Sequence, residues 1–251
     1  MAKRARTFCL AGWIAVVAIT AGAAPKNSTI EVRNAGIPGQ NSSEGLDRFQ
    51  RDVVEAHPQI VLIYFGMNDS INEPKMLSTD AYLENIGKMV EFAQAANILP
   101  IVTTIQHVDT ARVLQRHAAS AYGPEGPNGR IDRFNAALGQ FTAKHHVKLA
   151  DFNSAFDATG GPTTARSTDG VHLTAAGYTL LAQTFLAALP QDLRKTTRIV
   201  AIGDSLTFGV PLRTMEHDSP KTYPAILQTL LRNRPRQLTS DDKLRVLKTP
   251  R

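Results

Sequence analysis

Short runs of β-branched and other apolar residues alternate along this chain with longer stretches in which apolar residues recur at helical spacing. Each run has the length of a strand buried on both faces, and each intervening stretch is long enough to form a helix. This alternation is typical of a parallel sheet covered by helices. The runs predicted to be strands are 29–33, 59–65, 99–105, 147–151 and 198–202.

The stretches between these runs each present one apolar helix face. Further helices are expected from about Thr174 to Leu189 and from Tyr223 to about Arg232. The predicted fold is therefore a three-layer α/β/α sandwich with a central parallel sheet of about five strands. The three apolar faces are formed by Leu46, Phe49, Val53 and Val54, by Leu83, Ile86, Val90 and Ala93, and by Ile131, Phe134, Leu138 and Phe141.

The first residues have the layout of a secretory signal peptide. Basic residues within positions 3–6 precede an apolar run at 8–19 and a small-residue stretch at 21–24. The apolar run is shorter than the roughly 20 residues that span a bilayer, so no stable membrane span is expected after cleavage. We therefore predict a signal peptide at 1–24 and a secreted or periplasmic protein. The only cysteine, Cys9, lies in this segment and does not follow the small-residue pattern of a lipoprotein cleavage site, so neither a disulfide nor a thiol nucleophile is expected.

Residues 25–236 are expected to form a single domain, followed by a C-terminal tail at 237–251. The chain has 28 basic and 22 acidic residues, and three basic residues leave with the signal peptide, so the net charge falls from +6 to about +3. Apart from the tail after Arg232, the basic residues are scattered among acidic ones. A nucleic-acid partner requires a clustered basic face, and none is predicted. The sequence does not predict an oligomeric state.

Polar and glycine-rich clusters follow several of the predicted strands. In a parallel sheet, ligands bind at the carboxyl ends of the strands, so these clusters are where chemistry is expected. The clusters are Asn34-Ala35-Gly36-Ile37-Pro38-Gly39, Gly66-Met67-Asn68-Asp69 and Gly203-Asp204-Ser205-Leu206. A fourth, Asp169-Gly170-Val171-His172, precedes the helix expected at Thr174.

Ser205 is the best candidate for a nucleophile, because it follows a strand through a Gly-Asp turn. A serine hydroxyl needs a base to take its proton and a third group to orient that base. His172 is the candidate base, and Asp169, three residues earlier, is close enough to bond one imidazole nitrogen. The alternative interpretation is that these are ordinary turn and helix-entry residues.

Acyl transfer also creates an oxyanion, which requires hydrogen-bond donors. The candidates are the backbone N–H of Ser205, the backbone N–H of Gly39 and the side-chain amide of Asn68. The alternative interpretation is that Asn68 holds its own loop by hydrogen bonds and that Gly39 supplies a positive φ.

Together, these four clusters resemble the characteristic blocks of the SGNH (GDSL-type) hydrolase family. The matching segments are 199–209 for the nucleophile block, 34–39 for the glycine block, 66–69 for the Gly-x-Asn-Asp block and 169–174 for the Asp-x-x-His block. The resemblance implies a flavodoxin-like fold and a serine ester hydrolase. It also implies Ser205 as nucleophile, His172 as base, Asp169 as its partner, and Gly39 and Asn68 as oxyanion donors beside the Ser205 amide.

The order of the blocks departs from that family, which normally begins with the serine block. In this chain the serine block, within 198–210, comes after the Asp-x-x-His block. A circular permutation would explain this order, because compact domains often have their termini close together. It predicts that strand 198–202 lies in the middle of the sheet, flanked by strands from the N-terminal part of the chain.

The expected function is hydrolysis of carboxylic acyl esters of small molecules, with short acyl chains favoured, without a metal or an organic cofactor. A carbohydrate O-acetylesterase or an acyl thioesterase would use the same residues. A non-enzymatic alternative is a ligand-binding α/β module, because glycine-rich strand ends also suit phosphate or flavin. The long polar stretch at 106–129 is expected to be either a surface loop with a short helix or part of the acyl or alcohol pocket.

Overall fold

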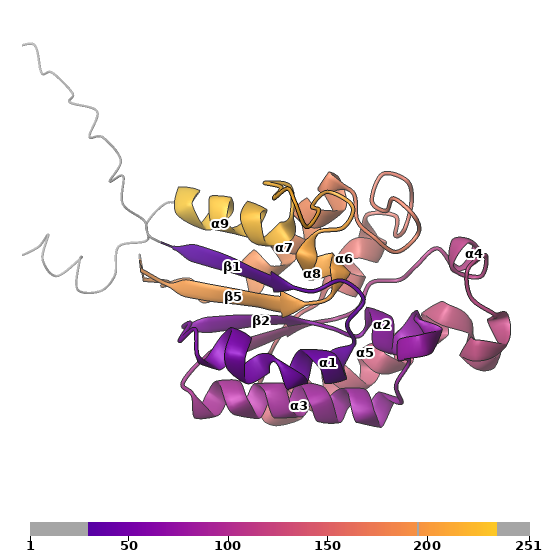
Figure 1. Cartoon of the computed structure of the whole chain (residues 1–251), viewed down its shortest axis with the longest axis horizontal. Helices are drawn as coiled ribbons and strands as arrows, with labels where there is room; N and C mark the ends of the chain where they lie inside the picture. Colours follow the sequence, from indigo (N-terminus) through magenta and orange to yellow (C-terminus); the bar gives the residue numbers. More distant parts are fainter. Residues whose placement is uncertain (1–29, 195, 235–251) are drawn as a thin grey trace, which may run out of the picture.

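The computed structural model describes residues 30–194 and 196–234, and its centre is a sheet of five parallel strands. The predicted signal peptide and the tail at 237–251 lie outside these described residues. The strand order across the sheet is β1-β5-β2-β3-β4 (Figure 1). The bounds are β1 (Glu31–Gly36), β2 (Ile60–Tyr64), β3 (Leu99–Thr103), β4 (Lys148–Ala150) and β5 (Arg198–Gly203).

Strand β5, although last in the chain, lies inside the sheet. Ala201 in β5 is in register with Asn34 of β1 on one side and with Leu62 of β2 on the other. This confirms the predicted position of the strand. If β5 is counted first, the strand order becomes 2-1-3-4-5, which is the order of flavodoxin-like sheets.

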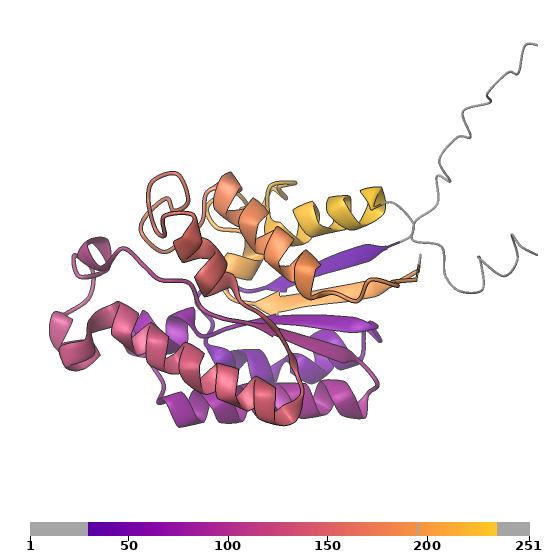
Figure 2. The ribbon, with the colours of Figure 1, turned by 180° about the vertical axis from the view of Figure 1, so that it is seen from behind.

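Helices cover both faces of the sheet and give the three layers that the sequence predicted (Figures 1 and 2). The strands are almost entirely apolar where helices cover both faces, and β2 is buried at every position. One layer contains α1 (Ser42–Asp47), the π-helical turn η1 (Gln50–Val54), α3 (Thr79–Ala95) and α5 (Gly126–His145). The other contains α6 (Phe152–Ala158), α7 (Ala175–Ala188) and α9 (Tyr223–Asn233).

Several short elements lie at the carboxyl ends of the strands, and apart from the short helix expected within 106–129 they were not predicted, because they are too short to show a helical period. The predicted run 99–105 also extends past its strand, which ends at Thr103. The Ile105 N–H donates to the Asn135 side chain (2.8 Å) instead of to a neighbouring strand. The short elements are α2 (Met67–Ile71), η2 (Glu73–Lys75), α4 (Thr110–Val113), η3 (Ala119–Glu125) and α8 (Ser205–Phe208).

Helix α9 covers the outer edge of β1. The Val32 N–H donates to Gln228 Oε1 (2.9 Å), and Arg232 Nε donates to the Ile30 carbonyl (3.1 Å). These side chains occupy backbone groups that would otherwise be open to another strand. They also bring the first and last parts of the described chain together. None of the helices among the described residues combines the length and apolarity needed to cross a membrane.

Candidate active site

Ser205 is the first residue of α8, directly after the turn that ends β5. This turn requires glycine at position 203, because a Cβ there would lie 2.1 Å from Thr207 Oγ1 and 2.4 Å from the Tyr64 carbonyl oxygen. Asp204 caps the helix by accepting the Leu206 N–H (2.8 Å). The turn therefore holds Ser205 at the carboxyl end of an inner strand, with its side chain only partly buried.

The three residues proposed from the sequence for acyl transfer lie in a hydrogen-bonded row. His172 Nε2 is 3.0 Å from Ser205 Oγ, and His172 Nδ1 is 2.8 Å from Asp169 Oδ2. Both distances are within the range of a direct hydrogen bond. This row has the geometry in which an imidazole can take a proton from a serine hydroxyl while a carboxylate orients the ring.

The Asp169 carboxylate is held in its ionised form. Burial alone would raise the pKa of Asp169, but hydrogen bonds from the His172 ring and from the backbone N–H groups of His172 and Val171 hold it well below its ordinary value. Those backbone bonds are 2.7 Å from His172 N and 2.9 Å from Val171 N to Asp169 Oδ1. A negative charge beside His172 favours the imidazolium that forms when the ring takes a proton.

The turn carrying Asp169 and His172 is fixed from both ends. Gly170 has a φ of +92°, which an L side chain rarely adopts. The Ser167 hydroxyl accepts the Gly170 N–H (3.0 Å) and donates to the His172 carbonyl (2.9 Å). Thr174 caps α7 by accepting the Gly177 N–H (3.2 Å), as its position in the sequence suggested.

The glycine block lies against the turn at 203–205, which is called the nucleophile turn below. The Ile37 N–H donates to the Gly203 carbonyl (3.0 Å), and Gly39 has a φ of +78° with open space where a Cβ would be. Within the described part of the chain, no protein acceptor bonds the backbone N–H of Gly39 or of Ser205. Both groups are therefore available as donors.

Asn68 also lies at the nucleophile turn, but its amide is already engaged. Asn68 Nδ2 donates to the Gln40 carbonyl (2.9 Å) and to Asp204 Oδ2 (3.2 Å). Its Oδ1 accepts from Asn72 Nδ2 (2.9 Å). Asn68 therefore holds its own loop by hydrogen bonds, which is the alternative interpretation given above for this residue.

A buried arginine joins the glycine block to β5, and the sequence did not single it out. Arg48 donates to Gln40 Oε1 (2.6 Å), to the Ala35 carbonyl (2.7 Å) and to the Gly203 carbonyl (3.0 Å). Burial lowers the pKa of Arg48, and the pairing with Asp52 (2.9 Å) opposes that shift. In the sequence, Arg48 stands next to the apolar face of its helix, where a charged residue is normally on the surface. Helical periodicity alone therefore could not predict that Arg48 is buried and contacts β5.

Asp69, next to Asn68, is buried and anchors the Gly-x-Asn-Asp block to α1. It accepts the Ser42 backbone N–H (3.0 Å) and the Ser42 hydroxyl. Burial raises the pKa of Asp69 to about 6, against the opposing effect of the Ser42 hydrogen bonds. The carboxyl therefore has a positioning role beneath the site.

The stretch at 106–129 packs against the turn that carries Asp169. The Asp109 N–H donates to the Gly170 carbonyl (2.9 Å), and Arg112 and Arg116 donate to the carbonyls of Thr168 (3.1 Å) and Asp169 (3.3 Å). Further along, the Tyr122 hydroxyl donates to the Ile71 carbonyl of α2 (2.6 Å). The stretch therefore connects the Asp-x-x-His block to the Gly-x-Asn-Asp block.

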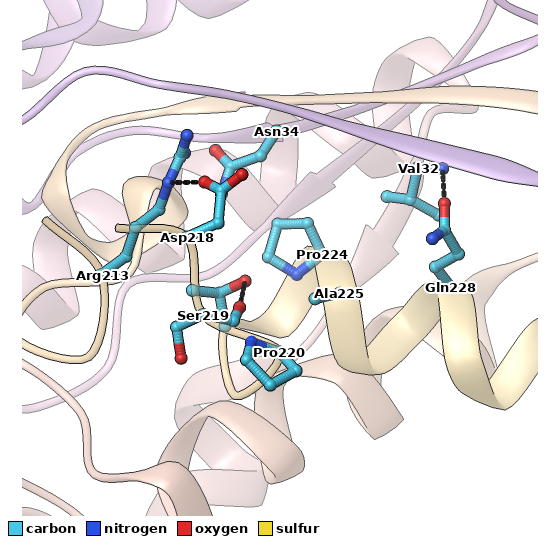
Figure 3. Close-up of a pocket in the computed structure, with 10 residues that line it drawn as sticks. Val32, Asn34, Arg213, Asp218, Ser219, Pro220, Pro224, Ala225 and Gln228 are labelled. Atoms are coloured by element: carbon cyan, nitrogen blue, oxygen red, sulfur yellow. Dashed lines mark hydrogen bonds and ion pairs between the residues drawn. The ribbon is translucent and has the colours of Figure 1, made fainter. Parts of the chain in front are cut away.

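A pocket of about 410 Å³ lies between the edge of β1 and α9, apart from these residues (Figure 3). Arg213 pairs with Asp218 (2.7 Å) at one end of the pocket, and Gln228 contacts Val32 at the other. Ser205, His172 and Asp169 do not line it, so it is separate from the candidate active site. Its lining residues are Val32, Asn34, Arg213, Asp218, Ser219, Pro220, Thr222, Pro224, Ala225 and Gln228.

Comparison with known sequences gives a family match. The model of the GDSL-like lipase/acylhydrolase family matches residues 5–180, a range that contains Gly39, Asn68, Asp169 and His172 and ends before Ser205. The chain is also 27% identical over 150 residues to the uncharacterized lipoprotein YqeF of Bacillus subtilis (strain 168). That match covers 55% of this chain and 62% of the relative, so the chain spans less than two thirds of the relative's length.

Solved structures with the same architecture include a lipase/acylhydrolase from Enterococcus faecalis. It is 25% identical to this chain with a TM-score of 0.51, and the match covers 61% of this chain and 71% of the other. A candidate acylhydrolase from Bacteroides fragilis NCTC 9343 is 28% identical with a TM-score of 0.50, over 60% of this chain and 70% of the other.

Proposed function

The chain belongs to the GDSL-like lipase/acylhydrolase family, and on that premise we propose that it is a serine esterase that hydrolyses acyl esters of small molecules through an acyl-Ser205 intermediate. The observation that carries this proposal is the position of the His172 ring between Asp169 and Ser205, at 2.8 Å and 3.0 Å. A merely structural histidine at a helix entrance would not need a serine hydroxyl on one nitrogen and a carboxylate on the other.

In the proposed reaction, His172 Nε2 takes the proton of Ser205 as Oγ bonds to the carbonyl carbon of the ester. The tetrahedral intermediate then collapses, the bond to the alcohol oxygen breaks, and His172 returns the proton to the departing alcohol. Water next attacks the acyl carbon and gives a proton to His172; the bond from that carbon to Ser205 Oγ then breaks, the carboxylic acid leaves, and His172 returns the proton to Oγ. Every proton is handled by His172, and the scheme requires no metal or organic cofactor.

The oxyanion of the intermediate would be held by the backbone N–H groups of Ser205 and Gly39 and by the Asn68 amide. The first two are supported by their lack of a protein acceptor among the described residues. Asn68 is supported by its contact with the nucleophile turn through Asp204 (3.2 Å). Such donors each lower the barrier by a few kcal/mol, about 3–4 in measured cases.

The substrate is proposed to be a short-chain carboxylic ester, with an acetylated sugar or an acyl thioester as the alternative donors. A panel of aryl esters of rising acyl length, acetylated sugars and an acyl thioester would rank them. Arg112 and Arg116 lie over the Asp169 turn, so the stretch at 106–129 is the segment in which differences in preference should be sought.

Ser205→Ala tests the function directly. We expect hydrolysis of an activated ester to fall by at least about 1,000-fold, because the covalent step is lost. Ser154→Ala, an exposed serine on α6, is the matched control and should keep the activity of the parent. Hydrolysis retained in Ser205→Ala would overturn the proposal.

We also propose that the family fold is present in circularly permuted order. The support is the strand order, which becomes the flavodoxin-like order when β5 is counted first, and the family match, which ends before the serine block. The contact between Arg232 and the Ile30 carbonyl brings the two ends of the described chain within reach of a short join.

Export is proposed from the sequence of residues 1–24 and is supported by similarity to a relative named as a lipoprotein. We propose cleavage of an ordinary signal peptide and not lipoprotein processing, because the sequence around Cys9 does not match a lipoprotein cleavage site. Intact mass of the protein recovered from an exporting host should show a chain beginning near residue 25. A cell-retained protein with Met1 intact would contradict export.

A further inference from the structure

The side-chain amide of Asn68 has no spare hydrogen in this structure. Its two N–H groups donate to the Gln40 carbonyl (2.9 Å) and to Asp204 Oδ2 (3.2 Å). The Gln40 carbonyl can only accept, which fixes which end of the amide is the nitrogen, and the Asn72 side chain donates to Asn68 Oδ1 (2.9 Å). An oxyanion can therefore use this amide only by sharing or replacing one of the two acceptors.

The longer of the two contacts is to a carboxyl group that also caps α8, the helix that begins at Ser205. Asp204 is 1% exposed, and its Oδ1 accepts the Leu206 N–H (2.8 Å) at the start of α8, where Ser205 is the first residue. Its Oδ2 accepts from Asn68. One buried carboxyl thus connects the side chain of Asn68 to the backbone that carries Ser205.

We propose that Asp204 is a positioning residue whose carboxylate holds the Asn68 amide at the nucleophile, where one of its N–H groups can be shared with an oxyanion. An ionised carboxylate accepts a hydrogen bond more strongly than a protonated carboxyl does. A proton on Asp204 would weaken its bond to Asn68 and loosen the position of the amide at the reaction centre. This inference rests on the proposed function, in which Asn68 is an oxyanion donor.

The surroundings of Asp204 support a change of charge near neutral pH. Burial raises the pKa of Asp204 to about 7, opposed by the Leu206 hydrogen bond and by His172 and reinforced by Asp69. Three tyrosines from three elements lie near enough for the charge of Asp204 to raise their pKa, and their ordinary pKa is already too high for them to titrate in this range. They are Tyr64 of β2, Tyr178 of α7 and Tyr223 of α9.

A double-mutant cycle separates positioning from general damage. Asp204→Asn keeps an oxygen for the Leu206 N–H but turns an NH₂ group toward the Asn68 NH₂, so kcat should fall by about 10–100-fold with little change in KM. In an Asn68→Ala background, the same substitution should change kcat by less than about three-fold, because the group it positions is absent. A loss that is equal in both backgrounds would overturn the proposal.

Thr207→Val is the matched control, because Thr207 is a buried residue of α8 whose hydroxyl contacts Tyr223 (3.2 Å) instead of Asn68. Any effect of Thr207→Val on kcat should be independent of Asn68→Ala, so that the activation free energies of the two substitutions add. Non-additivity of similar size in this control would mean that any change in α8 couples to Asn68, and the specific role of Asp204 would be refuted.

A spectroscopic readout needs no ester turnover. The side-chain amide ¹⁵N resonance of Asn68, identified by its absence in Asn68→Ala, should shift with pH with a midpoint near 7, and the shift should disappear in Asp204→Asn. A shift that persists in Asp204→Asn would come from another group, such as the neighbouring Asp69, and would contradict the inference. If Ser205→Ala stays active while the resonance titrates as expected, the failure lies with the proposed function and not with the coupling of Asp204 to Asn68.

Discussion

His172 depends on two neighbours that come from different parts of the chain. Asp169 lies three residues before it on the same turn, whereas Ser205 reaches it from β5 and α8. The carboxylate has three hydrogen-bond donors, and only one of them is the imidazole. It therefore holds the shape of the turn as well as the orientation of the ring.

This double role gives a prediction for Asp169→Asn. The amide keeps one oxygen for the backbone N–H groups but cannot supply the charge that favours the imidazolium, so kcat should fall by about 1,000-fold or more while the fold is retained. Steady-state kinetics with an activated ester, together with far-ultraviolet circular dichroism, would measure both. Activity close to that of the parent would show that Asp169 acts only as a turn residue.

At the scale of elements, the residues that could be predicted are those whose role shows in a local pattern. All five strands were found because each contains a short apolar segment, although the edge strands β1 and β4 are only partly buried and the inner strands β2, β3 and β5 are almost fully buried. Ser205, His172 and Asp169 were found because turn residues follow or precede such elements. Arg48 and Asp204 were not, since each acts through contacts between segments distant in sequence.

The contact between β1 and α8 depends on Gly36. A Cβ at this position would lie 2.1 Å from the Phe208 backbone nitrogen, so Gly36→Ala should push α8 away from the sheet and displace Ser205. We expect both the free energy of unfolding and kcat to fall. Overpacking of this kind costs typically about 1–3 kcal/mol.

Gly139→Ala in α5 is the control for that substitution, because nothing lies within 4 Å of its Cβ position. An alanine there should raise the free energy of unfolding by about 0.5–1 kcal/mol through helix propensity. Urea unfolding of both variants would test the pair. A neutral Gly36→Ala variant would mean that β1 and α8 are not packed as described.

For the whole molecule, two buried carboxyls make stability depend on pH. Burial raises the pKa of Asp69 to about 6 and that of Asp204 to about 7. In the unfolded chain both have a pKa of about 4, so between about pH 4 and 7 the folded protein binds more protons than the unfolded one. The free energy of unfolding should therefore fall as pH rises through this range and level off above about pH 7.

Urea unfolding at pH 5.5 and at pH 8 would measure this dependence, and Asp204→Asn should reduce the difference between them. The lowered pKa of Asp169 does not contribute in this window, because its stabilisation is lost only at lower pH. Greater stability at pH 8 than at pH 5.5, unchanged by the substitution, would contradict the account of these buried groups.

The permuted order also gives a prediction for the whole chain. A reordered gene that opens the connection at 190–197 and joins residue 236 to residue 28 through a short flexible linker should give the same fold and comparable ester hydrolysis, because Arg232 and Ile30, the described residues nearest to this join that contact each other, lie side by side. Opening the chain inside β3 should prevent folding and serves as the control. A reordered chain that stays unfolded would count against the permutation.

The central claim is that Ser205, activated by His172, forms a covalent acyl intermediate. Treatment with an organophosphonate followed by peptide mass spectrometry tests it most directly, because the reagent bonds to an activated serine and stays attached. The account predicts one adduct, located on Ser205, and its loss in His172→Ala. An adduct on another residue, or none on a folded protein, would contradict it.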